Sequence, residues 1–116
     1  TITLENEAQM DAVTGVSGSG PAYLFHLIET LAFAGEKQGL PLDIATKLAR
    51  ATVAGAGALA IQSNETAAQL RVNVTSPNGT TQAALEVLMN EKTGLQPLIT
   101  QTVAAATLRS KELSNG

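Results

Sequence analysis

Cysteine is absent from this sequence of 116 residues, and charged and aromatic residues are scarce. The lack of cysteine excludes a disulfide framework, a thiolate zinc site and a cysteine nucleophile. Charged residues make up 15% of the chain, against roughly 25% in an average soluble domain. Because hydrophobic residues reach 44%, a monomer would have too little polar surface. We therefore expect an obligate oligomer that buries much of its surface against a second copy.

The charge balance and the hydrophobic runs argue against two kinds of partner. A net charge of −3 and a pI near 5.0 leave no basic surface for nucleic acid. The longest charge-free run, Ala12 to Ile28, is broken by glycines and by Pro21. The run from Ala51 to Ile61 is shorter than the ~20 residues of a membrane span. We expect no nucleic acid, no membrane and a cytoplasmic location. The start at Thr1, without a signal-peptide pattern, indicates a piece of a longer protein.

The spacing of apolar residues predicts an all-α fold, a single domain of about six helices. The expected helices cover residues 6–13, 21–38, 41–62, 63–72, 80–90 and 96–113. Asn6 is suited to cap the first helix, Pro21 to open the second and Gly39 to end it. For the fourth helix we expect Ser63 or Asn64 as the cap.

The expected helix at 21–38 is apolar on every side, with Glu29 its only charge before Glu36. Such a helix is buried, and in so short a chain a second subunit would cover it. The sole histidine, His26, has no partner His, Cys or acidic cluster nearby in sequence. We interpret it as a packed or hydrogen-bonded residue rather than a catalytic one. The segment 51–60, rich in alanine and glycine, indicates close approach of helix backbones.

A glycine-rich stretch, VTGVSGSGP at residues 13–21, invites comparison with a phosphate-binding loop. Its spacing of Gly15, Gly18 and Gly20 is not GxGxxG, and no strand–turn–helix unit surrounds it. We interpret the stretch as a helix break or kink in which glycines allow backbones to pack closely.

The stretch most suggestive of chemistry is VTSPNGTTQAALEVL, residues 74–88, in which a polar turn leads directly into an apolar helix. Pro77 fixes φ, and Asn78 and Gly79 tolerate left-handed backbone. The first turn of the helix, with Thr80 and Thr81, presents unpaired backbone N–H groups and the positive end of the helix dipole. Such a turn is suited to a small anion, most simply a carboxylate. The alternative is an ordinary N-cap without a ligand.

Two passages together resemble a known family: DAVTGVSGSGPAY at residues 11–23 and NVTSPNGTTQAALEVL at 73–88. They are similar to the signature stretches of the carboxy-terminal domain of pyrroline-5-carboxylate reductase, and the likeness extends over nearly the whole chain. The resemblance implies an all-helical domain that forms an interlocked homodimer, with a decamer as a further level of assembly in the family. It also implies reduction of 1-pyrroline-5-carboxylate to L-proline, the last step of proline biosynthesis.

The resemblance also implies roles for residues of the polar turn. The backbone N–H groups of Thr80 and Thr81, with the Ser76 hydroxyl and the turn at Gly79, would hold the substrate carboxylate. The Thr81 hydroxyl would reach the ring nitrogen. The family usually has Gly–Gly after the proline, and this sequence has Asn78 and then Gly79. Since asparagine tolerates positive φ better than other non-glycine residues, we expect the turn to be kept. We assign no catalytic residue and no metal ligand.

The resemblance places this chain as the second of two domains. Residues 1–5, TITLE, alternate like a strand and would be the end of a preceding Rossmann domain or a linker; residues 6–116 would form the helical dimerisation and substrate-binding domain. Nothing here matches the dinucleotide fingerprint, so NADPH or NADH would bind the absent domain, and this fragment alone would be inactive. The alternatives are a non-enzymatic helical oligomerisation module and the helical domain of another two-domain NAD(P)-dependent dehydrogenase.

Overall fold

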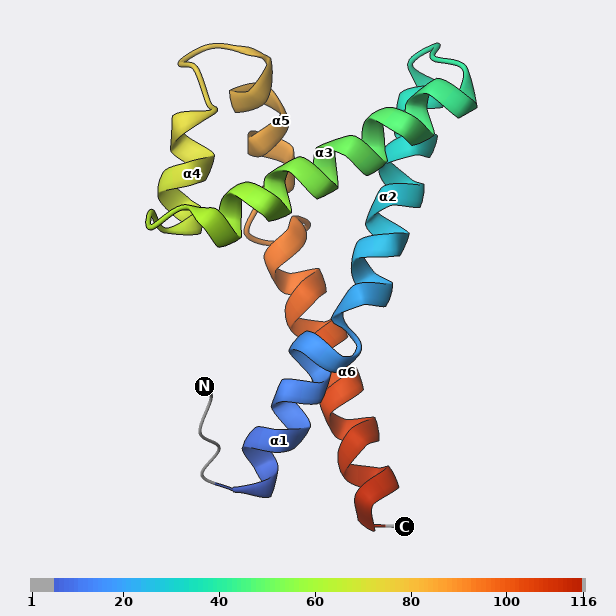
Figure 1. Cartoon of the computed structure of the whole chain (residues 1–116), viewed down its shortest axis with the longest axis vertical. Helices are drawn as coiled ribbons and strands as arrows, with labels where there is room; N and C mark the ends of the chain where they lie inside the picture. Colours follow the sequence, from blue (N-terminus) through green and yellow to red (C-terminus); the bar gives the residue numbers. More distant parts are fainter. Residues whose placement is uncertain (1–5, 116) are drawn as a thin grey trace. The chain divides into compact units, whose positions relative to one another are not determined.

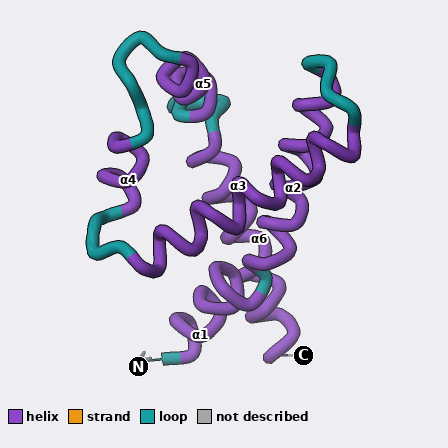
Figure 2. Tube along the Cα trace, turned by 45° about the horizontal axis from the view of Figure 1, so that its top comes forward, coloured by secondary structure: helices purple, strands orange, loops and turns teal. Residues whose placement is uncertain are grey.

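A computed structural model describes residues 6–115, and within that range the chain is all-α, without a strand. The elements, drawn in Figures 1 and 2, are α1 (Glu7–Val13), η1 (Thr14–Gly18), α2 (Gly20–Lys37), α3 (Leu42–Gln62), α4 (Ala67–Asn73), α5 (Thr80–Leu88) and α6 (Leu95–Asn115). The predicted all-α fold is confirmed. The expected strand at residues 1–5 lies outside the described residues. The chain divides into two compact units, one of residues 1–21 with 82–116 and one of residues 22–81.

In the first unit, α1 and η1 pack against α6. The Asn6 side chain accepts a hydrogen bond from Gln9 N at 2.9 Å and caps α1, as predicted. The glycine-rich stretch does not form a loop, because the π-helix η1 continues the chain from α1, and π-bulges are one of the known causes of a helix kink. A Cβ on the buried Gly15 would lie 2.5 Å from Thr107 Oγ1 on α6. The expected close packing is therefore confirmed at Gly15.

In the second unit, α2 ends where the sequence predicts. Gly39 has φ +103°, Gly39 N donates to Glu36 O at 2.9 Å and Leu40 N donates to Gly35 O at 3.2 Å. These two bonds form a Schellman motif, which satisfies the last carbonyls of α2. Proline 41 then precedes α3, which runs on for 21 residues.

The contact between α2 and α3 buries very few side chains. The buried apolar residues of the described chain are Ala32, Ala45 and Ala49, with Ile28 packed against them. An open apolar groove lies beside them between the same two helices, lined by Leu31, Leu40 and Leu48 among others. Three alanines are too little apolar surface for a core, so the stability of this unit must come from other contacts.

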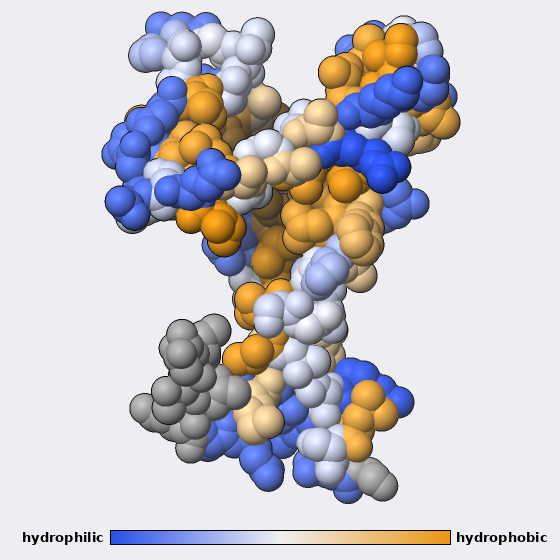
Figure 3. All heavy atoms as spheres, viewed as in Figure 1, coloured by the Kyte–Doolittle hydropathy of each residue, from blue (hydrophilic) through white to orange (hydrophobic). Residues whose placement is uncertain are grey.

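Helix α2, which we expect a second subunit to bury, is largely open in the single chain. Phe25 is 66% exposed and Phe33 55%, and Figure 3 shows hydrophobic residues, in orange, open on the viewed face. The close backbone approach expected at Gly55 and Gly57 is also missing, since nothing in the described chain lies within 4 Å of a Cβ built there. These exposed apolar side chains call for a covering partner.

By length and composition, α3 is the one described helix apolar enough to cross a bilayer. A core helix of a soluble protein meets the same criterion, and α3 carries Asp43, Lys47 and Arg50 in its first half. Burial against another protein surface explains its composition equally well.

Three helix boundaries differ from the sequence prediction by two residues or more: the start of α4 and the ends of α5 and α6. Helix α4 begins at Ala67, and its cap is Thr66, whose side chain accepts from Gln69 N at 3.1 Å. The expected cap Ser63 instead accepts from Glu65 N at 3.0 Å, in the turn that precedes α4. Helix α5 ends at Leu88, two residues earlier than expected.

Candidate functional site

The candidate site is the polar turn between α4 and α5, with its named residues all in the second unit. Gly79 N–H donates to Ser76 O at 3.1 Å, which closes a four-residue β-turn. Pro77 is the second residue of this turn, and Asn78 follows with φ 60°. Proline followed by a residue of positive φ is the pattern of a type II turn. The expectation that Asn78 keeps the turn is confirmed.

The sequence suggests that Gly79 provides left-handed backbone, but in the structure its lack of a side chain is what the turn uses. Among the described glycines only Gly39 has positive φ, so Gly79 does not use its left-handed freedom. A Cβ at Gly79 would lie 3.2 Å from Ser76 O and 3.5 Å from Ser76 Cβ. The turn is therefore tight enough to crowd any side chain at this position.

Helix α5 begins immediately after the turn, with Thr80 and Thr81 as its first two residues. The first N–H groups of an α-helix have no partner within the helix. Within residues 6–115, no backbone or side-chain acceptor is found for the N–H of either threonine. Thr80 is exposed, Thr81 is half-buried and Ser76 is exposed. The four predicted site residues thus lie in one short segment.

The chemistry available at this turn is limited to binding and orientation. Two adjacent amide donors at the positive end of α5 favour a carboxylate or a similar small anion. Hydroxyl groups at Ser76, Thr80 and Thr81 add hydrogen-bonding capacity, but residues 76–81 contain no ionisable side chain. Such a segment can fix an anionic substrate and cannot itself act as a strong general acid or base. No metal-binding group of three His, Cys, Asp or Glu residues occurs in the part of the chain that the structure describes.

The sequence analysis missed a hydrogen-bonded set of side chains on α4, just before the turn. Asn73 Nδ2 donates to Glu65 Oε2 at 2.9 Å, and Gln69 Nε2 donates to Asn73 Oδ1 at 2.7 Å. The i,i+4 spacing of Gln69 and Asn73 was the available signal. The bond to Glu65 spans eight residues and had no such signal.

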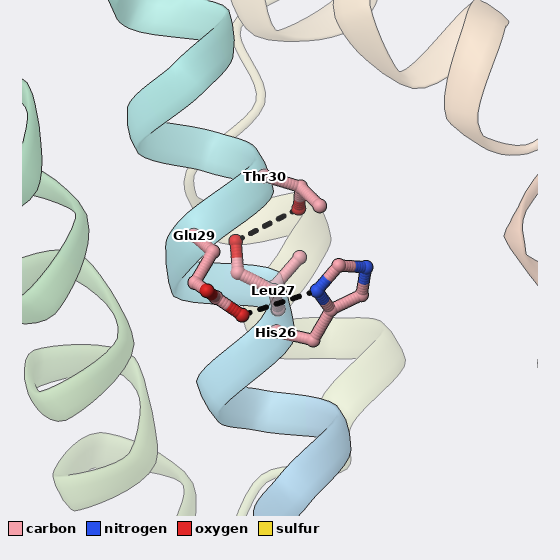
Figure 4. Close-up of polar contacts among 4 residues, drawn as sticks. All are labelled: His26, Leu27, Glu29 and Thr30. Carbon is pink, nitrogen blue, oxygen red and sulfur yellow. Dashed lines mark hydrogen bonds and ion pairs between the residues drawn. The ribbon is translucent and has the colours of Figure 1, made fainter.

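His26 lies on α2 and forms a hydrogen bond, which is one of the two predicted alternatives, packed or hydrogen-bonded. Its Nδ1 is 3.2 Å from Glu29 Oε1, as Figure 4 shows, and the two side chains are 75% and 76% exposed. Nearby, Thr30 Oγ1 donates to Leu27 O at 3.0 Å. His26 is therefore paired but not packed within the single chain, and these contacts connect it to no other candidate residue.

Comparison with known proteins identifies the family. Residues 7–113 match the family described as pyrroline-5-carboxylate reductase dimerisation. The pyrroline-5-carboxylate reductase of Pseudomonas aeruginosa is 48% identical over 111 residues, covering 96% of this chain and 40% of the relative. The reductase of Pisum sativum is 49% identical over 104 residues, covering 90% of this chain and 37% of the relative.

Solved structures agree with these relatives. A pyrroline-5-carboxylate reductase from Coxiella burnetii has a TM-score of 0.87 and 40% identity, covering 95% of this chain and 40% of that chain. Plasmodium falciparum pyrroline carboxylate reductase with NADP bound has a TM-score of 0.84 and 35% identity, covering 93% and 40%. The chain thus spans about two fifths of the length of the relatives it matches. It belongs to the pyrroline-5-carboxylate reductase dimerisation family.

Proposed function

We propose that this chain is the dimerisation and substrate-binding domain of a pyrroline-5-carboxylate reductase, which reduces 1-pyrroline-5-carboxylate to L-proline with NADPH or NADH. The observation that carries the proposal is the pair of unpartnered amides at Thr80 and Thr81 beside Ser76, in a chain of this family. They would hold the substrate carboxylate in the turn closed by Gly79. The Thr81 hydroxyl would then orient the imine nitrogen.

The described residues do not fit a dinucleotide. No strand precedes the glycine-rich stretch within residues 6–115. Gly15 and Gly18 lie in a π-helix that packs on α6, and Gly20 begins α2, so none of the three lies in a phosphate loop. We therefore place NADPH or NADH in a preceding domain, of which residues 1–5 would be the end, and assign residues 6–116 to the helical domain. This fragment alone would be inactive. The Plasmodium falciparum structure contains NADP, which supports a nicotinamide cofactor for the intact enzyme.

A second copy of this chain is the partner we propose for the exposed apolar surface. The exposed apolar side chains of α2 and α3, among them Phe25 at 66%, Phe33 at 55% and Leu48 at 54%, form the surface that this copy would cover. Glycines 55 and 57, open in the single chain, would allow the partner backbone to approach α3. Burial of α3 in this way makes a membrane unnecessary. The decamer implied by the resemblance and the cytoplasmic location stay predictions.

The experiment that tests the proposal is steady-state kinetics on the intact enzyme with Thr81→Ala. Loss of a hydrogen bond to the substrate should lower kcat/KM for the imine about tenfold or more, while KM for the nucleotide changes little. Thr81→Ser keeps the hydroxyl and is the matched control. Equal effects on both substrates would remove the substrate role from this turn. The coding sequence upstream of Thr1 should also contain a strand followed by GxGxxG.

A further inference from the structure

The most unusual polar feature outside the turn is the set of side chains along α4, which we call the α4 clamp: Glu65, Gln69 and Asn73. The amide of Asn73 uses its donor and its acceptor at once. Asn73 Nδ2 donates to Glu65 Oε2 at 2.9 Å, and Asn73 Oδ1 accepts from Gln69 Nε2 at 2.7 Å. Asn73 is exposed, but one N–H and one lone pair of its amide are each used within the chain.

The clamp connects the two ends of a very short helix. Helix α4 has seven residues, with Thr66 as its cap and Asn73 as its last residue. Isolated helices shorter than roughly 12 residues are marginal in water, and α4 contains no buried residue. Because Glu65 precedes the cap, its bond to Asn73 spans the whole helix. The clamp therefore joins the segment before α4 to its last residue.

The chain between α4 and the turn is hydrogen-bonded back onto the last turn of α4. Thr75 N donates to Val72 O at 3.0 Å, and Thr75 Oγ1 donates to Arg71 O at 2.6 Å, so Thr75 is bound back onto α4. Ser76, the next residue, begins the β-turn that Gly79 N closes by donating to Ser76 O at 3.1 Å. The position of Ser76 thus follows the last turn of α4.

We propose that the α4 clamp is a positioning device for the substrate turn. By fixing Asn73, it fixes the end of α4, and through Thr75 it fixes Ser76 at the entry to the turn. Asn73 is a positioning residue and not a catalytic one, because it would act through the Ser76–Thr81 segment. The inference rests on the proposed function and adds the source of the turn's rigidity.

The test uses the intact reductase and a polarity swap within the clamp. Asn73→Ala removes both bonds, and kcat/KM for the imine should fall roughly three- to tenfold, with the nucleotide KM within about twofold. Asn73→Asp sets a carboxylate against the Glu65 carboxylate and should lower kcat/KM at least as much. Adding Glu65→Gln should restore activity, because the introduced amide can donate to the introduced carboxylate. Glu65→Gln alone keeps an acceptor for Asn73 and is the matched control.

The swap separates positioning from a general loss of stability. Recovery of the imine KM in the Glu65→Gln, Asn73→Asp double variant supports the clamp, as does a loss in Glu65→Ala equal to that in Asn73→Ala. Glu65 precedes α4, so Glu65→Ala carries the same test should Asn73→Ala fail to fold. The clamp is refuted if the double variant is no better than Asn73→Asp, or if the KM values of imine and nucleotide rise together. A wild-type enzyme that does not reduce the imine would instead refute the proposed function.

Discussion

The aromatic side chain of Phe25 offers a quantitative test of the proposed dimer. It is 66% exposed on α2 in the single chain. A phenylalanine side chain can bury about 200 Å², so a partner could remove roughly 130 Å² from water, worth about 3 kcal/mol at about 25 cal/mol per Å². Alanine would keep about 1 kcal/mol of this, which leaves a loss of about 2 kcal/mol for each copy of the residue. Because a symmetric dimer contains the residue twice, Phe25→Ala should weaken association by about 4 kcal/mol, roughly a thousandfold in Kd.

Sedimentation velocity over a concentration series measures this change directly. Phe25→Leu is the matched control, since it keeps most of the apolar area and should cost less than about 1.5 kcal/mol. Alanine has the higher helix propensity, so α2 itself should not be weakened, and circular dichroism at 222 nm checks this. A Kd for Phe25→Ala equal to that of the wild type would show that the partner does not cover this face of α2.

Two further substitutions test the local geometry. Gly15→Ala would place a Cβ 2.5 Å from Thr107 Oγ1, and overpacking of roughly 1–3 kcal/mol should exceed the gain of about 1 kcal/mol in helix propensity. Gly20→Ala is the control, because no neighbour lies within 4 Å of a Cβ built at that position. Chemical denaturation compares the two variants. A Gly15→Ala protein as stable as the Gly20→Ala protein would contradict the packing of Gly15 against α6. Asn78→Val forces a β-branched residue to φ 60°. The strain should lower the stability of the turn by about 1–2 kcal/mol and raise KM for the imine. An unchanged KM for the imine would mean that the turn does not bind the substrate.

The sequence predicted a helix end correctly where only one nearby residue was suited to cap or to end the helix. Asn6 could only cap, and Gly39 could only end α2 before a proline, and both did so. The cap of α4 was misplaced because Ser63, Asn64 and Thr66 are all capable caps within four residues, and only the tertiary path selects Thr66.

The π-helix and the α4 clamp were beyond sequence reasoning for different reasons. No residue pattern distinguishes a π-helix from a glycine-rich helix break. The sequence could therefore predict a break or kink at residues 13–21 but not the π-helix η1. The clamp depends on how far the turn before α4 folds back, since it joins Glu65 to a residue eight positions later. The turn at residues 76–81 could be predicted because proline and asparagine favour turn conformations through their own local geometry. Its role in substrate binding stays a prediction.

The most direct measurement of the central claim is a crystal structure of the intact enzyme with L-proline. The account predicts that both carboxylate oxygens lie within about 3.2 Å of the backbone nitrogens of Thr80 and Thr81, with the Ser76 hydroxyl beside them. A proline carboxylate held elsewhere, with these two amides bonded to protein carbonyls, would contradict it.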